Sequence, residues 1–265
     1  MKIAVCIKQV PATTEVKFDP ETNTLVREGV DSQINPFDLY ALEEAVRTKE
    51  RLQADGEESS VTVVCMGPPQ AQDALREAVA LGADETILLS DRAFGGADTW
   101  ATSYTLGLGL KKIEPDIVFC GMQAIDGDTG QVGPGIATHI DYAQATYVAK
   151  IESLDKKKIT VKRLVENGYE VCSVKLPIVI TVVKEINEPR TPSLRGKMNA
   201  KKAQITTWGA ADLEAPVEKL GLSGSPTQVA KVFSPPHREG GEKSEGEPDE
   251  LAEKLFGLLK ELEIV

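Results

Sequence analysis

Short apolar runs alternate with amphipathic segments along the first half of the chain. The apolar runs have the length and character of strands buried in the centre of a sheet. We predict such strands at residues 2–7, 61–65, 86–89 and 117–120. Between them apolar residues recur at helical spacing, and we predict helices from 36 to just before Gly56, at 71–81 and at 99–112, and a fourth that begins near Gly133. Alternating units of this kind give an α/β fold with a mainly parallel sheet and helices on both faces.

The pattern changes in residues 146–184. Shorter apolar stretches follow one another there, separated by tight polar turns. They predict strands at residues 146–151, 159–164, 169–174 and 178–183, which we expect to extend the sheet with antiparallel strands. Nearer the N-terminus, residues 15–18 and 24–27 alternate in polarity across a turn and predict a β-hairpin.

From Asn187 onward the chain loses its regular pattern. Residues 188–195 are punctuated by proline, and residues 234–250 have the composition of a linker. The last segment predicts an amphipathic helix, with leucines at 251, 255, 258, 259 and 262. A short helix behind a linker is marginal alone, so it must dock on its own core or on another subunit. We therefore expect an α/β domain over 1–186 and an extended C-terminal arm over 187–265.

The stretch 115–137 combines the features of a phosphate-binding loop. A buried strand ends at Gly121, a loop with Gly127 and Gly130 follows, and Gly133-Pro134 leads into a helix. The first amides of a helix lack internal partners and lie at the positive end of its dipole. Glycines let the backbone come close to a ligand. The arrangement therefore favours a bound phosphate.

Acidic residues leave the role of this loop open. Asp126 and Asp128 repel phosphate, unless they accept hydrogen bonds from ribose hydroxyls or loop amides while the amides alone meet the phosphate. The loop could also be an ordinary turn in which Asp128 or Thr129 caps the next helix. Asn35-Pro36 starts an earlier helix, which is either a second amide-rich terminus for a ligand or a well-capped structural helix.

Polar segments follow each of the four predicted parallel strands. They are residues 8–11, residues 66–68, the residues before Asp98, and residues 121–135. In open α/β sheets such strand exits lie along one edge, and ligands bind there. We therefore expect a nucleotide to lie across this edge.

Composition narrows the function classes. The chain has 265 residues, a net charge of −11 and a pI of about 4.9, which disfavours a nucleic-acid-binding surface. No apolar run approaches the ~20 residues of a membrane span. A strand begins directly after Met1, so we expect a cytoplasmic protein without a signal peptide. The four cysteines lie far apart with no CxxC motif, and we expect buried free thiols rather than a metal site or disulfides.

Taken together, these motifs resemble the beta subunit of electron-transfer flavoprotein over nearly the whole chain. Each motif is weak alone, but their order is specific. They are residues 5–10 (VCIKQV), 35–38 (NPFD), 65–68 (CMGP), 121–134, 161–163 (VKR) with Glu166, Gly168, Glu170 and Pro177, 187–190 (NEPR), and the Leu-rich final helix.

The resemblance implies a Rossmann-like fold of the adenine nucleotide alpha-hydrolase type, and a heterodimer in which the C-terminal arm wraps an alpha subunit. In one branch of the family the nucleotide site holds AMP as a structural ligand. In the electron-bifurcating branch it holds FAD, which NADH reduces. One electron then passes to ferredoxin or flavodoxin. The other passes through the FAD of the alpha subunit to an acyl-CoA or other flavin dehydrogenase.

The loop sequence decides between the two branches of the resemblance. Residues 125–134 resemble the bifurcating branch, and Asp38 and residues 97–99 point the same way. FAD is therefore favoured over AMP. Because the flavin carries the electrons, we expect no catalytic side chain. The protein would contribute to the reaction by positioning the flavin and by its electrostatic effect on it.

The resemblance also implies which residues contact the cofactor. Amides of residues 128–134 would hold the diphosphate, while Asn35, Asp38 and the backbone of residues 6–8 would hold adenine and ribose. The complete expected set is Cys6, Ile7, Lys8, Asn35, Asp38, Met66, Gly67, Asp98, Thr99, Thr102, Gly121, Gln123, Asp126, Gly127, Asp128, Thr129, Gly130, Gln131, Val132, Gly133 and Pro134. Within it, Met66 and Gly67 would pack on the ligand, and the residues at 98, 99 and 102 would approach the flavin.

Alternatives from other classes are a regulatory nucleotide-binding module of the universal-stress type and an ATP-cleaving ligase. The first shares the α/β core but not the arm after residue 186. The second needs a serine- and glycine-rich loop after the first strand, and Lys8-Gln9-Val10-Pro11 is not one. Residues 188–197 resemble the loop by which this family docks on its dehydrogenase, and the alternative is an ordinary surface loop.

Overall fold

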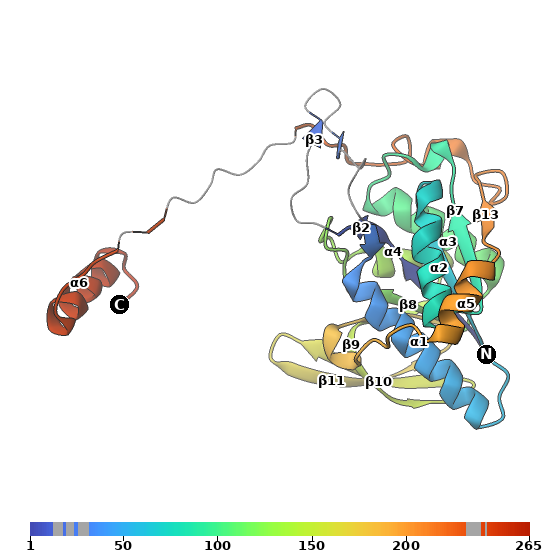
Figure 1. The fold of residues 1–265 in the computed structure, drawn as a ribbon, viewed down its shortest axis with the longest axis horizontal. Helices are drawn as coiled ribbons and strands as arrows, with labels where there is room; N and C mark the ends of the chain where they lie inside the picture. The colour runs from blue at the N-terminus through green and yellow to red at the C-terminus, as the bar shows by residue number, and fades with distance from the viewer. Residues whose placement is uncertain (13–17, 20–23, 26–31, 232–239, 242) are drawn as a thin grey trace. The chain divides into compact units, whose positions relative to one another are not determined.

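A computed structural model describes residues 1–12, 18–19, 24–25, 32–231, 240–241 and 243–265 (Figure 1). They divide into two compact units, Met1–Ala230 and Lys231–Val265. The first unit contains a nine-stranded sheet, and the second contains the predicted final helix, α6 (Pro248–Glu261). Within the described ranges, no helix is both long and apolar enough to cross a bilayer.

The large sheet has the strand order β11-β10-β9-β12-β8-β1-β6-β7-β13. Its strands are β1 (Lys2–Ile7), β6 (Ser60–Met66), β7 (Glu85–Leu89), β8 (Ile117–Gly121), β9 (Ala143–Leu154), β10 (Lys158–Val165), β11 (Gly168–Lys175), β12 (Ile178–Val182) and β13 (Thr206–Trp208). The six adjacent strands β12, β8, β1, β6, β7 and β13 all run parallel to one another. The prediction of a mainly parallel sheet is confirmed.

The centre of the sheet is a continuous apolar layer. Val5 of β1 is paired with Val63 of β6 on one side and with Phe119 of β8 on the other. Phe119 is in turn paired with Ile180 of β12. All four side chains are fully buried in one cluster, which explains why their segments read as unbroken apolar runs in the sequence.

Two pairs of helices cover the two faces of the sheet (Figure 1). The four helices are α1 (Pro36–Ala54), α2 (Gln72–Leu81), α3 (Thr99–Ile113) and α4 (Val132–Ile140). Leu42 of α1 and Leu75 of α2 are buried in one apolar cluster. Leu110 of α3 and Ile136 of α4 are buried in the other. The predicted helices on both faces are therefore confirmed.

The expectation of antiparallel strands after residue 145 is only partly right. β9 pairs antiparallel with β10, and β10 pairs antiparallel with β11, as expected. β12 instead runs parallel to both β8 and β9 and lies between them, inside the sheet. All five of its residues are buried, and an unbroken apolar run is typical of a central parallel strand.

Only parts of the predicted N-terminal hairpin lie within the described residues. β3 (Phe18–Asp19) and β4 (Thr24–Leu25) pair antiparallel, as the alternation predicts. The remaining residues of that hairpin lie outside the described ranges. Next to it, β2 (Gln9–Pro11) and β5 (Ser32–Ile34) form a second short antiparallel pair, which the sequence did not indicate.

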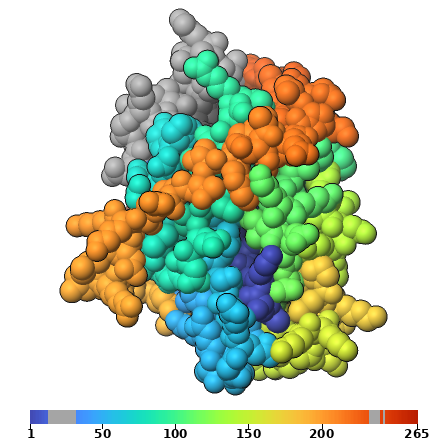
Figure 2. Space-filling model, turned by 90° about the vertical axis from the view of Figure 1, so that its right-hand side faces the viewer, coloured from blue at the N-terminus to red at the C-terminus, as the bar shows by residue number. Residues whose placement is uncertain are grey.

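Residues after 187 contribute to the first compact unit. Helix α5 (Leu194–Lys202) and strand β13 were not predicted, because α5 is polar and β13 has only three residues. Arg76 of α2 donates hydrogen bonds to the carbonyl oxygens of Ala200 and Ala203. Figure 2 shows this orange segment running across the face that carries α2. The partner-binding role expected for residues 187–265 stays a prediction.

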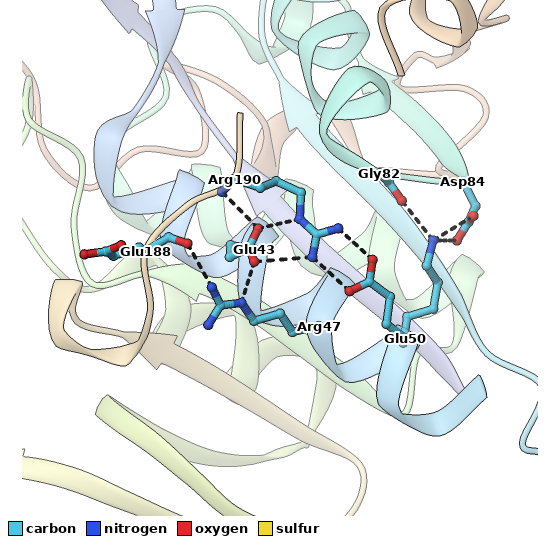
Figure 3. A network of polar contacts seen from close by, with 8 residues as sticks. Glu43, Arg47, Glu50, Gly82, Asp84, Glu188 and Arg190 are labelled. Carbon is cyan, nitrogen blue, oxygen red and sulfur yellow. Dashed lines mark hydrogen bonds and ion pairs between the residues drawn. The ribbon is translucent and has the colours of Figure 1, made fainter. Parts of the chain in front are cut away.

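An arginine clamps the start of this segment onto α1 (Figure 3). Arg190 donates from its backbone N–H and from Nε to Glu43, at 3.2 and 2.7 Å. It also forms an ion pair with Glu50, at 2.6 Å. Arg47, one turn along α1, bonds to Glu43 and to the carbonyl oxygen of Glu188. Burial alone raises the pKa of the Glu43 carboxyl, but the hydrogen bonds from Arg190 and Arg47 outweigh it and hold that pKa below its usual value.

We expect Arg190→Met to lower the free energy of unfolding by roughly 1–2 kcal/mol near neutral pH, because it leaves the buried Glu43 carboxylate short of donors. Urea unfolding measures the difference. The loss should shrink as the pH falls below about 4, where the carboxyl becomes protonated in the unfolded chain. Arg195→Met, on the exposed side of α5, is the control. Equal stability of wild type and Arg190→Met would contradict the clamp.

Candidate functional site

The strand order reverses between β1 and β8, and we call the region at the carboxyl ends of these two strands the crevice. From β1 the chain proceeds to β6 and β7 on one side, and then returns to β8 and β12 on the other. The connections at the carboxyl ends of β1 and β8 therefore diverge, and this is the point at which open α/β sheets bind ligands. The exits of β1, β6, β7 and β8 lie along one edge, as the sequence predicts.

A single carboxylate joins the exits of β1 and β8. Asp38, in the first turn of α1, accepts from the amide of Lys8 at 2.7 Å and from the amide of Gly121 at 3.2 Å. A Cβ on Gly121 would lie 2.4 Å from Asp38 Oδ1 and 2.7 Å from the carbonyl carbon of Phe37. Only glycine allows the exit of β8 to come this close to α1.

Asn35 joins the same two exits with its side chain. Its Nδ2 donates to the carbonyl oxygen of Gln123 at 2.8 Å, and its Oδ1 accepts from the amide of Ile125 at 3.1 Å. Its own amide donates to the carbonyl oxygen of Lys8. Asn35 holds the N-cap position of α1, as predicted, but its side chain does not cap the helix. The side chains of Asn35 and Asp38 thus shape the crevice by bonding to backbone groups of the two strand exits. Their contact with adenine or ribose stays a prediction.

Burial changes the titration of Asp38. It raises the pKa of this carboxyl from 3.8 to about 7, against the opposing effect of the amides of Lys8 and Gly121 that bond to it. The side chain is almost fully buried, so the carboxylate has lost the hydration that favours its charged form.

The glycine-bearing loop is held in a defined conformation. Asp128 and Gly130 have left-handed backbones, with φ of +51° and +63°. The Asp128 amide donates to the carbonyl oxygen of Ala124 at 2.9 Å, and its carboxylate accepts from Gln123 Nε2 at 2.9 Å. The other loop carboxylate, Asp126, pairs with Lys8 Nζ at 2.6 Å. Both carboxylates therefore have donors within the protein.

The start of α4 offers amides to a ligand. The helix begins at Val132 with Gln131 at its N-cap, and no side chain among the described residues caps it. The alternative in which Asp128 or Thr129 caps this helix is wrong. No described side chain therefore caps the amides of Val132 and Gly133, which lie at the positive end of the helix dipole. Gly133 also has a packing role, since a Cβ there would lie 2.4 Å from Thr181 Cγ2.

Asp98 caps α3, as predicted, but its carboxylate is fully engaged. Oδ1 accepts from the amide of Ala101 at 3.0 Å, and Oδ2 accepts from the amide and hydroxyl of Thr227 at 3.0 and 2.8 Å. Burial opposes these hydrogen bonds, yet together they lower the pKa of Asp98. Beside it, Thr99 Oγ1 lies 3.3 Å from Thr129 Oγ1, which connects α3 with the glycine-bearing loop.

The cysteines near the crevice are free thiols. Cys6 and Cys120 are paired residues of β1 and β8, and Cys65 lies on β6; all three are buried, as expected. Burial raises the pKa of Cys65 to about 12. The thiol of Cys172 is also free, but this residue is only half-buried.

The predicted residues thus come from the exits of three neighbouring strands, β1, β6 and β8, and from the starts of the helices α1, α3 and α4. A cavity of about 580 Å³ lies elsewhere, along α3 and α4 beside residues 218–226, and its lining includes none of the predicted residues. Tyr147 of β9, which the sequence analysis did not include, lies beside Gly130. No periodicity or motif could have indicated it, because a strand irregularity sets its position.

Comparison with known proteins decides the family. The family model described as "Electron transfer flavoprotein domain" matches residues 22–213. The chain is 49% identical over 266 residues to "Electron transfer flavoprotein subunit beta" of Thermoanaerobacterium thermosaccharolyticum, covering the whole of both chains. The chain belongs to the electron transfer flavoprotein family, as a beta subunit. The universal-stress and ligase alternatives are thereby set aside.

Other relatives carry more specific names. The chain is 51% identical over 267 residues to "Caffeyl-CoA reductase-Etf complex subunit CarD" of Acetobacterium woodii, again over both full lengths. It is 47% identical to "Protein FixA" of Rhizobium leguminosarum bv. phaseoli, over 97% of this chain and 94% of that one. As an electron transfer flavoprotein beta subunit, the chain has an alpha subunit as its partner.

The raised pKa of Asp38 predicts an unusual pH dependence. Between about pH 4 and pH 7 the folded chain retains a proton that the unfolded chain has released. The free energy of unfolding should therefore fall as the pH rises through this window, by roughly 4 kcal/mol for this group, and level off above it. Asp38→Asn removes the titration, so wild type should gain stability relative to this variant as the pH is lowered.

Urea unfolding at several pH values from about 5 to 8 tests this. Asp155→Asn changes an exposed carboxyl whose pKa is lowered by the amides of Lys157 and Lys158, so it should show no such trend over this range. A constant stability difference between wild type and Asp38→Asn across the window would contradict the assignment.

Proposed function

We propose that this beta subunit binds FAD at the crevice between β1 and β8 and serves in electron bifurcation. The observation that carries the proposal is the uncapped start of α4, which follows a loop with left-handed residues at Asp128 and Gly130. Free amides at the positive end of a helix dipole favour a diphosphate. The carboxylates of the loop have protein donors, so their repulsion of an anion is weakened.

The residues of the crevice fit the parts of a dinucleotide. Amides from Asp128 to Gly133 would hold the diphosphate. The backbone of residues 6–8 and the exit of β6 at Met66–Gly67 would contact the adenosine, with Asn35 and Asp38 fixing the walls. Thr99 and Thr102, on the first turn of α3, would face the other end of the ligand. A bound FAD would supply a group that can take two electrons from NADH and pass them on singly.

The loop sequence and the names of the relatives support the proposed bifurcating role. Residues 125–134 resemble that branch, and one relative is named as a subunit of a caffeyl-CoA reductase complex. We propose an acyl-CoA or related flavin dehydrogenase as one partner and ferredoxin or flavodoxin as the other. The alternative is a carrier without bifurcation that holds AMP at the same site.

Residues 188–197 are proposed as the dehydrogenase-docking segment. Leu194 and Met198 on α5 expose 79% and 55% of their surface. Arg195, Lys197, Lys201 and Lys202 make the same helix basic in a chain whose net charge is −11. The Arg190 clamp on α1 fixes the start of this segment, and strand β13 pairs with β7 further along the chain.

The heterodimer purified with its alpha subunit should contain about two flavins, one of them exchangeable. Titration with NADH without oxygen should bleach the flavin of the beta site, followed by its absorption spectrum. A heterodimer with one flavin that releases AMP on denaturation would contradict the proposal and support the carrier alternative.

Two glycines of the loop provide a matched pair of variants. Gly130→Ala should weaken FAD at the beta site about 5- to 30-fold, because alanine disfavours the left-handed conformation there by roughly 1–2 kcal/mol. Gly127 has no left-handed backbone, and no described atom lies within 4 Å of an added Cβ, so Gly127→Ala should bind normally. Flavin fluorescence measures both affinities. Equal binding by the two variants would remove the phosphate assignment from Gly130.

A further inference from the structure

A β-bulge in β9 places a tyrosine at the glycine-bearing loop. Ile180 of β12 pairs with Ala145, and Val182 pairs with Val148, so β9 has one extra residue between these pairs. Tyr147 lies in this interval with a left-handed backbone, at φ +56°. A bulky residue in this conformation is strained, and it persists only where neighbouring groups hold it there.

Both neighbouring strands hold the bulge. From β12, the buried Thr181 accepts the N–H of Tyr147 on its hydroxyl at 3.0 Å. From β10, Arg163 donates from Nε to the carbonyl oxygen of Thr146 at 3.0 Å, and from Nη2 to the Thr146 hydroxyl at 2.9 Å. Glu170 of β11 accepts from the third guanidinium nitrogen at 3.1 Å. Arg163 of the VKR motif, with Glu170 as its own partner, thus fixes the residue before Tyr147.

The bulge directs the tyrosine hydroxyl toward the loop. Tyr147 Oη lies 3.7 Å from the position of a Cβ on Gly130. The side chain is 38% exposed, and within the described part of the chain no group hydrogen-bonds to the hydroxyl. A phenol is an uncharged hydrogen-bond donor. It therefore adds to the amides of the loop a donor that an anionic ligand can use.

We propose that Tyr147 is a further ligand-binding residue, whose hydroxyl donates to a phosphate oxygen of the bound nucleotide. Arg163 and Thr181 are positioning residues that hold its strained backbone. The inference rests on the proposed function, since it needs a nucleotide at the glycine-bearing loop. The tyrosine hydroxyl is neutral, so it donates a hydrogen bond to the ligand without adding a charge to the site.

The test uses the heterodimer depleted of its exchangeable FAD, titrated calorimetrically with ADP and with adenosine, which lacks phosphate. Tyr147→Phe keeps the ring and removes the hydroxyl. We expect it to weaken ADP about tenfold and to leave adenosine unchanged. Tyr169→Phe removes the same group from an exposed tyrosine of β11 and should bind both ligands as wild type does.

The outcomes separate this inference from the proposed function. If wild type binds neither ADP nor FAD at a second site, the proposed function fails. If wild type binds ADP and Tyr147→Phe binds it equally well, the inference fails. Equal losses for ADP and adenosine would also overturn it, because the hydroxyl would then contact the nucleoside or act only through the fold.

A double-mutant cycle tests the positioning role. Arg163→Lys keeps the charge but loses the fork that grips Thr146, and it should weaken ADP several-fold without affecting adenosine. In the Tyr147→Phe background it should add little, because both changes act through the same hydroxyl. Fully additive losses would show that Arg163 acts independently of Tyr147.

Discussion

The amides of Lys8 and Gly121 share one buried carboxylate, and the crevice takes its form from that contact. Asp38 sits at the start of α1, so the helix joins the exits of β1 and β8 at the point where the chain reverses its direction across the sheet. The contact requires glycine at 121 and leaves an acid deep in the protein. A required glycine and a buried carboxyl both reduce the stability of the fold. Their presence indicates that the position of these two strand exits is maintained at the expense of local stability.

In this strongly acidic chain, the carboxylates near the predicted site already accept hydrogen bonds from the protein itself. Asp126 is paired with Lys8, Asp128 accepts from Gln123, and Asp98 accepts from Ala101 and from Thr227 of a distant segment. The uncapped amides of α4 stand among these engaged carboxylates. The net charge of a protein therefore says little about the local field at a helix start, where dipoles and hydrogen bonds are arranged individually.

The sequence predicted the parallel sheet and the shared edge because apolar runs and strand exits follow from spacing alone. It failed where the determining contact is remote. The parallel direction of β12 depends on its insertion between β8 and β9. That no described side chain caps α4 depends on the residue at which the helix begins, which the conformation of the preceding loop determines. Tyr147 was missed for a related reason, since Arg163 and Thr181 on other strands impose its backbone conformation.

Strand β13 has a consequence for how the chain is made. It pairs with β7, so that Thr206 lies opposite Ile87 and covers an edge of the sheet with a segment from much later in the sequence. Until residue 208 has left the ribosome, β7 presents unpaired backbone groups, and open edges of this kind invite pairing with other chains. Completion of the sheet therefore waits until the residues of β13 have been made, and until then β7 has no partner on this side.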